Sequence, residues 1–227
     1  MAGSLQRFQK AALGAAFFVF GLSLPACAGL AQDQALVAAA ERGDIPGVQS
    51  ALREGASVSA RDGLGRTALL AATHGNQVEA ARLLIAAGAD VNAKDAIDDS
   101  PFLYAGAEGC NEILQMTLTV GADLKATNRY GGTALIPAAH HGHVETVKIL
   151  LATAIDKDHV NKLGWTALLE AVILGDGGPA HIEIVQLLVA AGADVKIPDR
   201  NGVTALMHAR QRGFSGMIRI LENVAGR

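Results

Sequence analysis

The sequence predicts an all-α solenoid of about six stacked helix-turn-helix units. A segment near the middle of the chain, GGTALIPAAHHGH at residues 131–143, returns when the sequence is shifted by 33 residues. Its Thr-Ala-Leu string at residues 133–135 recurs at 67–69 and 166–168, and as Ser-Pro-Phe at 100–102. Self-similarity at one fixed period indicates a repeat architecture in which each unit contacts only its neighbours.

The first 28 residues are predicted to be a signal peptide. Residues 1–10 contain Arg7 and Lys10 and no acid, and residues 11–24 are apolar up to Pro25, which should end the leader helix. This run is within the range of roughly 7–15 residues for a signal-peptide core and short of the roughly 20 needed to span a bilayer. The alternative is an uncleaved helical anchor.

Two processing routes are open. Ala26-Cys27-Ala28 fits a small-x-small cleavage site, which would release a soluble chain from about Gly29. Residues 24–27 resemble a bacterial lipobox, which would leave a lipidated Cys27, although a proline in this position is unusual for a lipobox. Membrane attachment is expected only through the leader or through Cys27.

Two glycine series mark the expected helix ends. The first ends each first helix, where a left-handed backbone is common and asparagine is the usual substitute for glycine; it comprises Gly43, Asn76, Gly109, Gly142, Gly175 and Gly213. The second ends each second helix at Gly55, Gly88, Gly121 and Gly192. Ala154 breaks this second series and would be strained in a left-handed conformation, unless its loop relaxes.

The units are expected at about residues 33–61, 62–94, 95–127, 128–160, 161–198 and 199–227, within one domain from residue 29 to 227. Isolated helices of roughly 8–10 residues are marginal in water, so each must stack on its neighbours. The first unit lacks the Thr-x-Leu opening, as expected of a capping unit. The fifth unit contains five extra residues at 176–180, which we interpret as a surface insertion, with a contact loop as the alternative.

The composition argues against a nucleic-acid binder. The chain has 19 Lys and Arg residues against 22 Asp and Glu, a net charge of −3. Removing Arg7 and Lys10 with the leader leaves 17 basic residues and a net charge of about −5, far from the basic excess of nucleic-acid-binding domains. No catalytic motif is recognisable, so no enzymatic activity and no cofactor are expected.

Over about residues 33–227 the chain resembles bacterial ankyrin-repeat proteins. The resemblance rests on the Thr-Ala-Leu opening, the Gly142-His143 corner and the Gly-Ala-Asp string at residues 88–90, 121–123 and 192–194. It implies a non-enzymatic scaffold, often monomeric, that binds another protein through its finger loops and concave face.

Scarce aromatic residues and arginines suggest where a partner binds, because both are enriched at binding hot spots. Tyr130 and Trp165 fall in finger segments and Tyr104 on an inner helix. The predicted partner-binding set is Tyr104, Tyr130, Trp165, Arg66, Arg129, Glu170 and His208. The alternative is that Tyr130 and Trp165 only pack against neighbouring fingers.

The leading hypothesis is an exported scaffold in the bacterial envelope, periplasmic or membrane-attached. The alternative is a metal- or redox-responsive protective protein using the His140, His141 and His143 cluster or Cys110. His140 and His141 are adjacent on a helix and so point about 100° apart, which is poor geometry for one ion. Cys110 stands in place of a turn histidine and is expected to be partly exposed.

Overall fold

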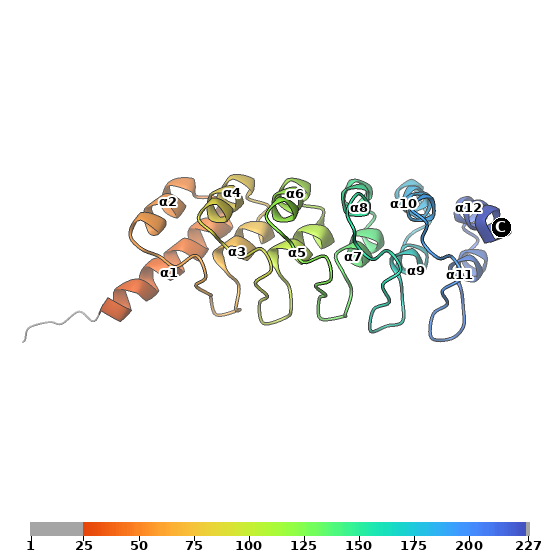
Figure 1. Cartoon of the computed structure of the whole chain (residues 1–227), viewed down its shortest axis with the longest axis horizontal. Helices are drawn as coiled ribbons and strands as arrows, with labels where there is room; N and C mark the ends of the chain where they lie inside the picture. Colours follow the sequence, from red (N-terminus) through yellow and green to blue (C-terminus); the bar gives the residue numbers. More distant parts are fainter. Residues whose placement is uncertain (1–24, 226–227) are drawn as a thin grey trace, which may run out of the picture.

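Short helices pair antiparallel and the pairs stack along one axis in the computed structural model, which describes residues 25–225 (Figure 1). Six inner helices lie on the finger side: α1 (Pro25–Arg42), α3 (Ala68–His74), α5 (Pro101–Glu108), α7 (Leu135–His140), α9 (Ala167–Ile173) and α11 (Ala205–Arg212). Six outer helices follow them: α2 (Ile45–Arg53), α4 (Val78–Ala86), α6 (Asn111–Thr119), α8 (Val144–Leu151), α10 (Pro179–Ala190) and α12 (Ser215–Ala225). The prediction of an all-α solenoid is confirmed.

Each inner helix begins where the repeat places a hydroxyl residue. Thr67, Ser100, Thr166 and Thr204 each accept a hydrogen bond from the backbone N–H three residues on, at 3.2–3.4 Å. This side-chain cap satisfies a donor that the first helical turn leaves free. The recurring Thr-x-Leu string is therefore a helix start, and its leucine is buried at positions 69, 135 and 168 and partly buried at 206.

The first helix is longer than predicted. α1 begins at Pro25, upstream of the expected start of the first unit near Asp33, so Pro25 opens a helix of this unit. Residues 1–24 of the predicted signal peptide and the side chain of Cys27 lie outside the described part of the chain, and both processing routes stay predictions. Within residues 25–225 no helix has the length and hydrophobicity needed to cross a bilayer.

Both predicted series have left-handed residues, with one error, and a third series in the finger loops was not predicted: Gly65, Asp98, Gly131, Gly164 and Gly202. Asn76 has φ 47° and the glycines at 43, 109, 142 and 213 have φ of 67–78°, as expected. The prediction of this conformation for Gly175 is wrong, because the left-handed residue between the two helices of the fifth unit is Gly177 (φ 74°). The five-residue insertion causes this shift. Its Pro179 starts α10 two residues before His181, whereas the equivalent His143 directly precedes α8.

Ala154 does not have the strained left-handed backbone that its place in the second series would require. It does not have a positive φ. In the other helix pairs with a glycine here, the backbone N–H that follows the glycine bonds to a carbonyl in the helix, as Ala89 N–H does to Leu84 O at 3.0 Å. The corresponding N–H of Ile155 instead donates to the hydroxyl of Thr153 at 3.2 Å. The loop relaxes, and no left-handed residue is needed.

Candidate functional site: the inner groove and its fingertips

The finger loops share one turn, built on an aspartate or asparagine. In each of five fingers the Oδ1 atom of this residue accepts hydrogen bonds from the backbone N–H groups two and four residues on, at 2.8–3.0 Å. The turn-forming residues are Asp62, Asp95, Asn128, Asn161 and Asp199. Because one acceptor fixes two donors, every fingertip has the same shape.

This turn exposes the residue two positions after the aspartate or asparagine. In four consecutive fingers that residue is large and apolar, and it is 45–62% exposed: Leu64, Ile97, Tyr130 and Leu163. We call these four residues the fingertip row. Scattered exposed apolar residues are ordinary, but a row repeated at one structural position along a surface is typical of an interaction site.

Beside the fingertips lies a groove of about 480 Å³, lined by α3, α5, α7, α9 and the three fingers between them. Four residues of the predicted partner-binding set line it: Tyr104, Arg129, Tyr130 and Glu170. Trp165, Arg66 and His208 do not line it. The structure therefore brings only part of the predicted set together, in the middle units of the stack.

Tyr104 of α5 forms part of the groove wall. Its ring stacks on that of His74 from the preceding unit, with centroids 3.8 Å apart and planes 14° from parallel. Burial lowers the pKa of His74 below its ordinary value, so this ring is neutral at neutral pH. The pair presents a rigid, half-buried aromatic surface.

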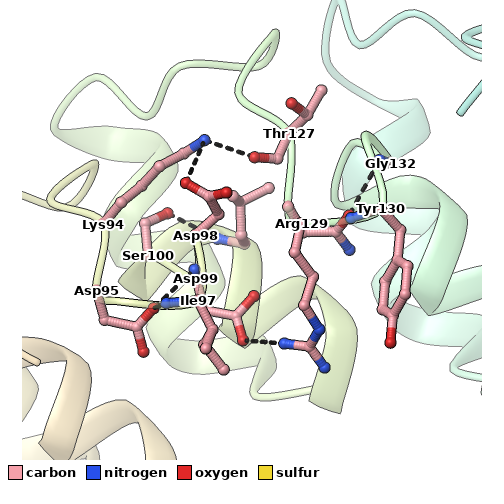
Figure 2. Close-up of polar contacts among 12 residues, drawn as sticks. Lys94, Asp95, Ile97, Asp98, Asp99, Ser100, Thr127, Arg129, Tyr130 and Gly132 are labelled. Atoms are coloured by element: carbon pink, nitrogen blue, oxygen red, sulfur yellow. Dashed lines mark hydrogen bonds and ion pairs between the residues drawn. The ribbon is translucent and has the colours of Figure 1, made fainter. Parts of the chain in front are cut away.

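Arg129 links two fingertips. Its Nη1 lies 3.4 Å from Asp99 Oδ2 in the preceding finger, and its guanidinium carbon lies 4.9 Å from the centre of the Tyr130 ring. Figure 2 shows this ion pair between the side chains of Ile97 and Tyr130. On the far side of the same fingers, Lys94 Nζ donates to Thr127 O at 2.6 Å (Figure 2). These contacts fix the two fingertips relative to each other.

Glu170 lies at the floor of the groove and is 6% exposed. Its Oε1 accepts a hydrogen bond from Asn161 Nδ2 at 2.8 Å, and its Oε2 lies 3.9 Å from His140 Nδ1. Burial raises the pKa of this carboxyl, and the hydrogen bond from Asn161 opposes the shift. A buried carboxylate with so few donors is unusual unless a function requires it.

The other predicted residues have structural contacts. Arg66 is largely buried between Glu41 Oε1 at 2.9 Å and Asp62 Oδ2 at 2.8 Å. Trp165 is partly buried against the hydrophobic core. His208 Nε2 lies 2.9 Å from Asp199 Oδ2. Arg66 and His208 thus each pair with an aspartate that forms a finger turn.

The positions of His140, His141, His143 and Cys110 do not favour the metal or redox alternative. Among the residues described, no group of three His, Cys, Asp or Glu side chains could hold a metal ion. His141 Nδ1 lies 2.8 Å from Ala107 O, which uses one of its two ring nitrogens. The prediction that Cys110 is partly exposed is wrong: it is 7% exposed, because its turn packs on the preceding unit with Sγ 3.9 Å from Thr73 O. Burial raises the pKa of its thiol.

Three residues of the fingertip row, Leu64, Ile97 and Leu163, and the floor residue Asn161 are not among the residues predicted from sequence. A signal for the row was present, because positions 64, 97, 130 and 163 repeat at the same 33-residue spacing as the helices. Only Tyr130 was selected, since it is aromatic. The common exposure of the four residues depends on the turn geometry, which the spacing alone does not reveal.

A stack of helix pairs with ordered fingers and an inner groove defines a repeat solenoid of the binding type. The chain belongs to the ankyrin-repeat family: the model described as "Ankyrin repeats (3 copies)" matches residues 19–95 and 102–199. Ankyrin repeats are protein-interaction scaffolds, and proteins of this family are generally non-enzymatic. No curated protein matches the chain.

Solved structures of ankyrin-repeat proteins are similar to the chain. One is an ankyrin repeat domain from Acinetobacter baumannii AYE, with 55% identity and a TM-score of 0.80, covering 84% of this chain and 97% of that one. Another is the ankyrin repeat protein EF0377, with 44% identity and a TM-score of 0.80 over the same shares. A third match, at 24% identity and a TM-score of 0.72, is to a complex of a Bdellovibrio bacteriovorus predatory endopeptidase with an immunity protein; it covers 84% of this chain and 98% of that one and shows the common fold.

Proposed function

We propose that this protein is a non-enzymatic scaffold of the bacterial cell envelope that binds one protein partner through the groove and the fingertip row. The observation that supports it best is the row itself, four exposed apolar side chains at one structural position beside the groove. Exposing these side chains costs free energy, which a partner would recover by burying them at about 25 cal/mol per Å² of apolar surface. Tyr104, Tyr130 and Arg129 are the proposed anchors.

In this proposal one partner contacts both the groove and the fingertip row. The A. baumannii and EF0377 structures support a binding role only through their family. The third structure is a complex of an endopeptidase with an immunity protein, which is a property of those two proteins. It is compatible with a partner that is also a protein.

A crosslinked pull-down from native cells tests the binding proposal. The baits are the full-length tagged protein, a Tyr130→Ser/Leu163→Ser variant, and Val120→Ser as a matched control. Val120 is 52% exposed, as Tyr130 is, and does not line the groove. A partner captured by the parent and the control, but lost with the double variant, supports the proposal. Equal capture by all three baits contradicts it.

The envelope location rests on the leader alone. Arg7, Lys10 and the apolar run at residues 11–24 favour export, and cleavage near residues 26–28 would shorten α1 at its N-terminal end. We propose a monomeric mature protein in the periplasm, with attachment through a lipidated Cys27 as the other route. Intact mass of the purified protein distinguishes a chain starting near Gly29, a chain starting at acylated Cys27, and an uncleaved chain. The last result would contradict both routes.

A further inference from the structure

The floor of the groove contains a carboxylate that the repeat does not require. The residue nine positions after the turn-forming residue lies on the inner helix of each finger-bearing unit, and it is Ala71, Tyr104, Pro137, Glu170 and His208 in chain order. Ala71 is fully buried in this position, so a methyl group satisfies the fold there. Glu170 therefore has to be explained by something other than stacking.

The contacts of Glu170 leave half of its carboxylate without a hydrogen bond. Asn161 donates to Oε1 at 2.8 Å, while Oε2 receives no hydrogen bond from residues 25–225. The next unit differs: Asp199, the counterpart of Asn161, pairs with His208 at 2.9 Å, so that acid has a complementary group. A buried carboxylate without full compensation is unfavourable, and a cationic ligand would remove part of that penalty.

The groove lining contains more acidic side chains than arginines or lysines. Asp99, Glu108 and Glu170 line it, against the single guanidinium of Arg129, which pairs with Asp99. His140 lines the groove too, and burial lowers its pKa, so that it adds no positive charge at neutral pH. The field at the floor therefore favours a cation and disfavours phosphates and acidic peptides.

Apolar side chains surround this negative floor. Pro137 and Leu174 line the groove beside Glu170, and Leu174 is 42% exposed. Lysine and arginine combine an apolar stem with a charged end, and they pack the stem on such surfaces while the end reaches a carboxylate. The apolar fingertip row lies on the finger side of the same groove.

We infer that the partner inserts a lysine or arginine side chain, flanked by apolar residues, into this groove. The cationic end pairs with Glu170, the stem packs on Pro137 and Leu174, and the flanking residues contact Ile97, Tyr130 and Leu163. This inference rests on the proposed function, since it names the chemistry of the partner segment for the same site. The partner is thus a polypeptide segment with an apolar-basic-apolar pattern.

A displayed library of random 12-residue peptides, selected on the immobilised full chain, tests the inference. The selected peptides are expected to share one Lys or Arg between apolar residues. Synthetic copies should lose at least about 10-fold in affinity when that residue is replaced by Met, and likewise on Glu170→Gln protein. The Gln side chain keeps an acceptor for Asn161, so the fold is retained. Glu145→Gln, which removes an exposed carboxylate of α8 outside the groove, is the matched control and should change nothing.

Two other outcomes separate this inference from the proposed function. Peptides without a basic residue, sensitive to Tyr130→Ser/Leu163→Ser but bound equally by Glu170→Gln, would overturn the cationic anchor and leave the binding site intact. If no selected peptide is sensitive to the fingertip variant, the proposed function itself fails, and the inference with it.

Discussion

Gly106 of α5 lies against Ala134, one unit further along the stack. A Cβ atom built on Gly106 would lie 2.8 Å from the Ala134 Cβ, closer than two such atoms approach in proteins. The inner helices are in contact here through small side chains, and the missing side chain of Gly106 sets the distance between the third and fourth units below the groove.

Gly106→Ala is therefore expected to destabilise the protein by about 1–3 kcal/mol, because overpacking outweighs the higher helix propensity of alanine. Urea unfolding measures the change. Ala134→Gly in the same chain should recover part of the loss by removing the clashing methyl group, which a double-mutant cycle detects. Gly106→Ala with unchanged or higher stability would show that the units are not in close contact here.

Of the five inner helices that follow a finger, α7 is the one without a side-chain cap at its start. Pro137 causes this loss. Proline has no N–H to donate to Thr133 O, so Ile136 N–H bonds to that carbonyl at 3.1 Å instead of to the threonine hydroxyl. The Thr133 hydroxyl is buried without a hydrogen-bond partner among the described residues. Thr166 in the next unit keeps its cap, with Leu169 N–H at 3.2 Å.

The same substitution should thus have different effects at two equivalent positions. Thr166→Val is expected to cost about 1 kcal/mol through the lost cap. Thr133→Val should cost nothing, or stabilise by up to about 1 kcal/mol, because it removes an unsatisfied hydroxyl. Chemical unfolding of both variants checks this pair. Equal losses at the two positions would mean that the Thr133 hydroxyl does form a bond.

Glu170→Gln should raise stability at neutral pH by about 1 kcal/mol, a typical gain when an unfavourable group is removed. Burial raises the pKa of Glu170 in the folded state, so the folded protein binds this proton more tightly than the unfolded chain does. The contribution of Glu170 to the free energy of unfolding therefore falls as pH rises above about 4.3, the pKa of a glutamate in the unfolded chain.

The advantage of Glu170→Gln should accordingly shrink as pH falls toward about 4.5, where the native carboxyl is increasingly protonated. Urea unfolding of the parent, Glu170→Gln and Glu145→Gln at both pH values measures it. A glutamine variant less stable than the parent at neutral pH would indicate that the charge of Glu170 is already compensated.

Cys110 should react slowly with a thiol reagent in the folded protein, because its sulfur is buried and its thiolate is disfavoured. In a Cys27→Ser background, where it is the only cysteine, modification is expected to be at least about 10-fold slower than in the urea-unfolded chain. Rapid labelling of the native protein would revive the redox hypothesis.

The repeat made the fold predictable from sequence. A hydroxyl residue at the helix start, large apolar residues after it and a left-handed glycine or asparagine at the helix end recur at nearly one spacing, so most helix starts and ends are marked more than once. The departures came from local changes. The insertion moved the left-handed residue from Gly175 to Gly177, and Thr153 relieved Ala154.

The site was harder to predict, since residue type does not reveal exposure. Arg66 was predicted to bind a partner, but it pairs with Glu41 of α1 and with Asp62 of its own finger. Cys110 looked accessible because it occupies a turn, yet that turn packs on the preceding unit. Ile97 and Leu163 are apolar and could lie in the core or on the surface by residue type alone, and only the finger turn shows that they are exposed.

Photocrosslinking in native cells shows whether a protein partner covers the fingertip row. Benzoylphenylalanine is introduced at position 130, at position 163, and at position 120 as the control. The expected result is the same partner adduct from positions 130 and 163 and none from position 120. Adducts from position 120 alone, or none from either fingertip in a folded and expressed protein, would contradict the claim.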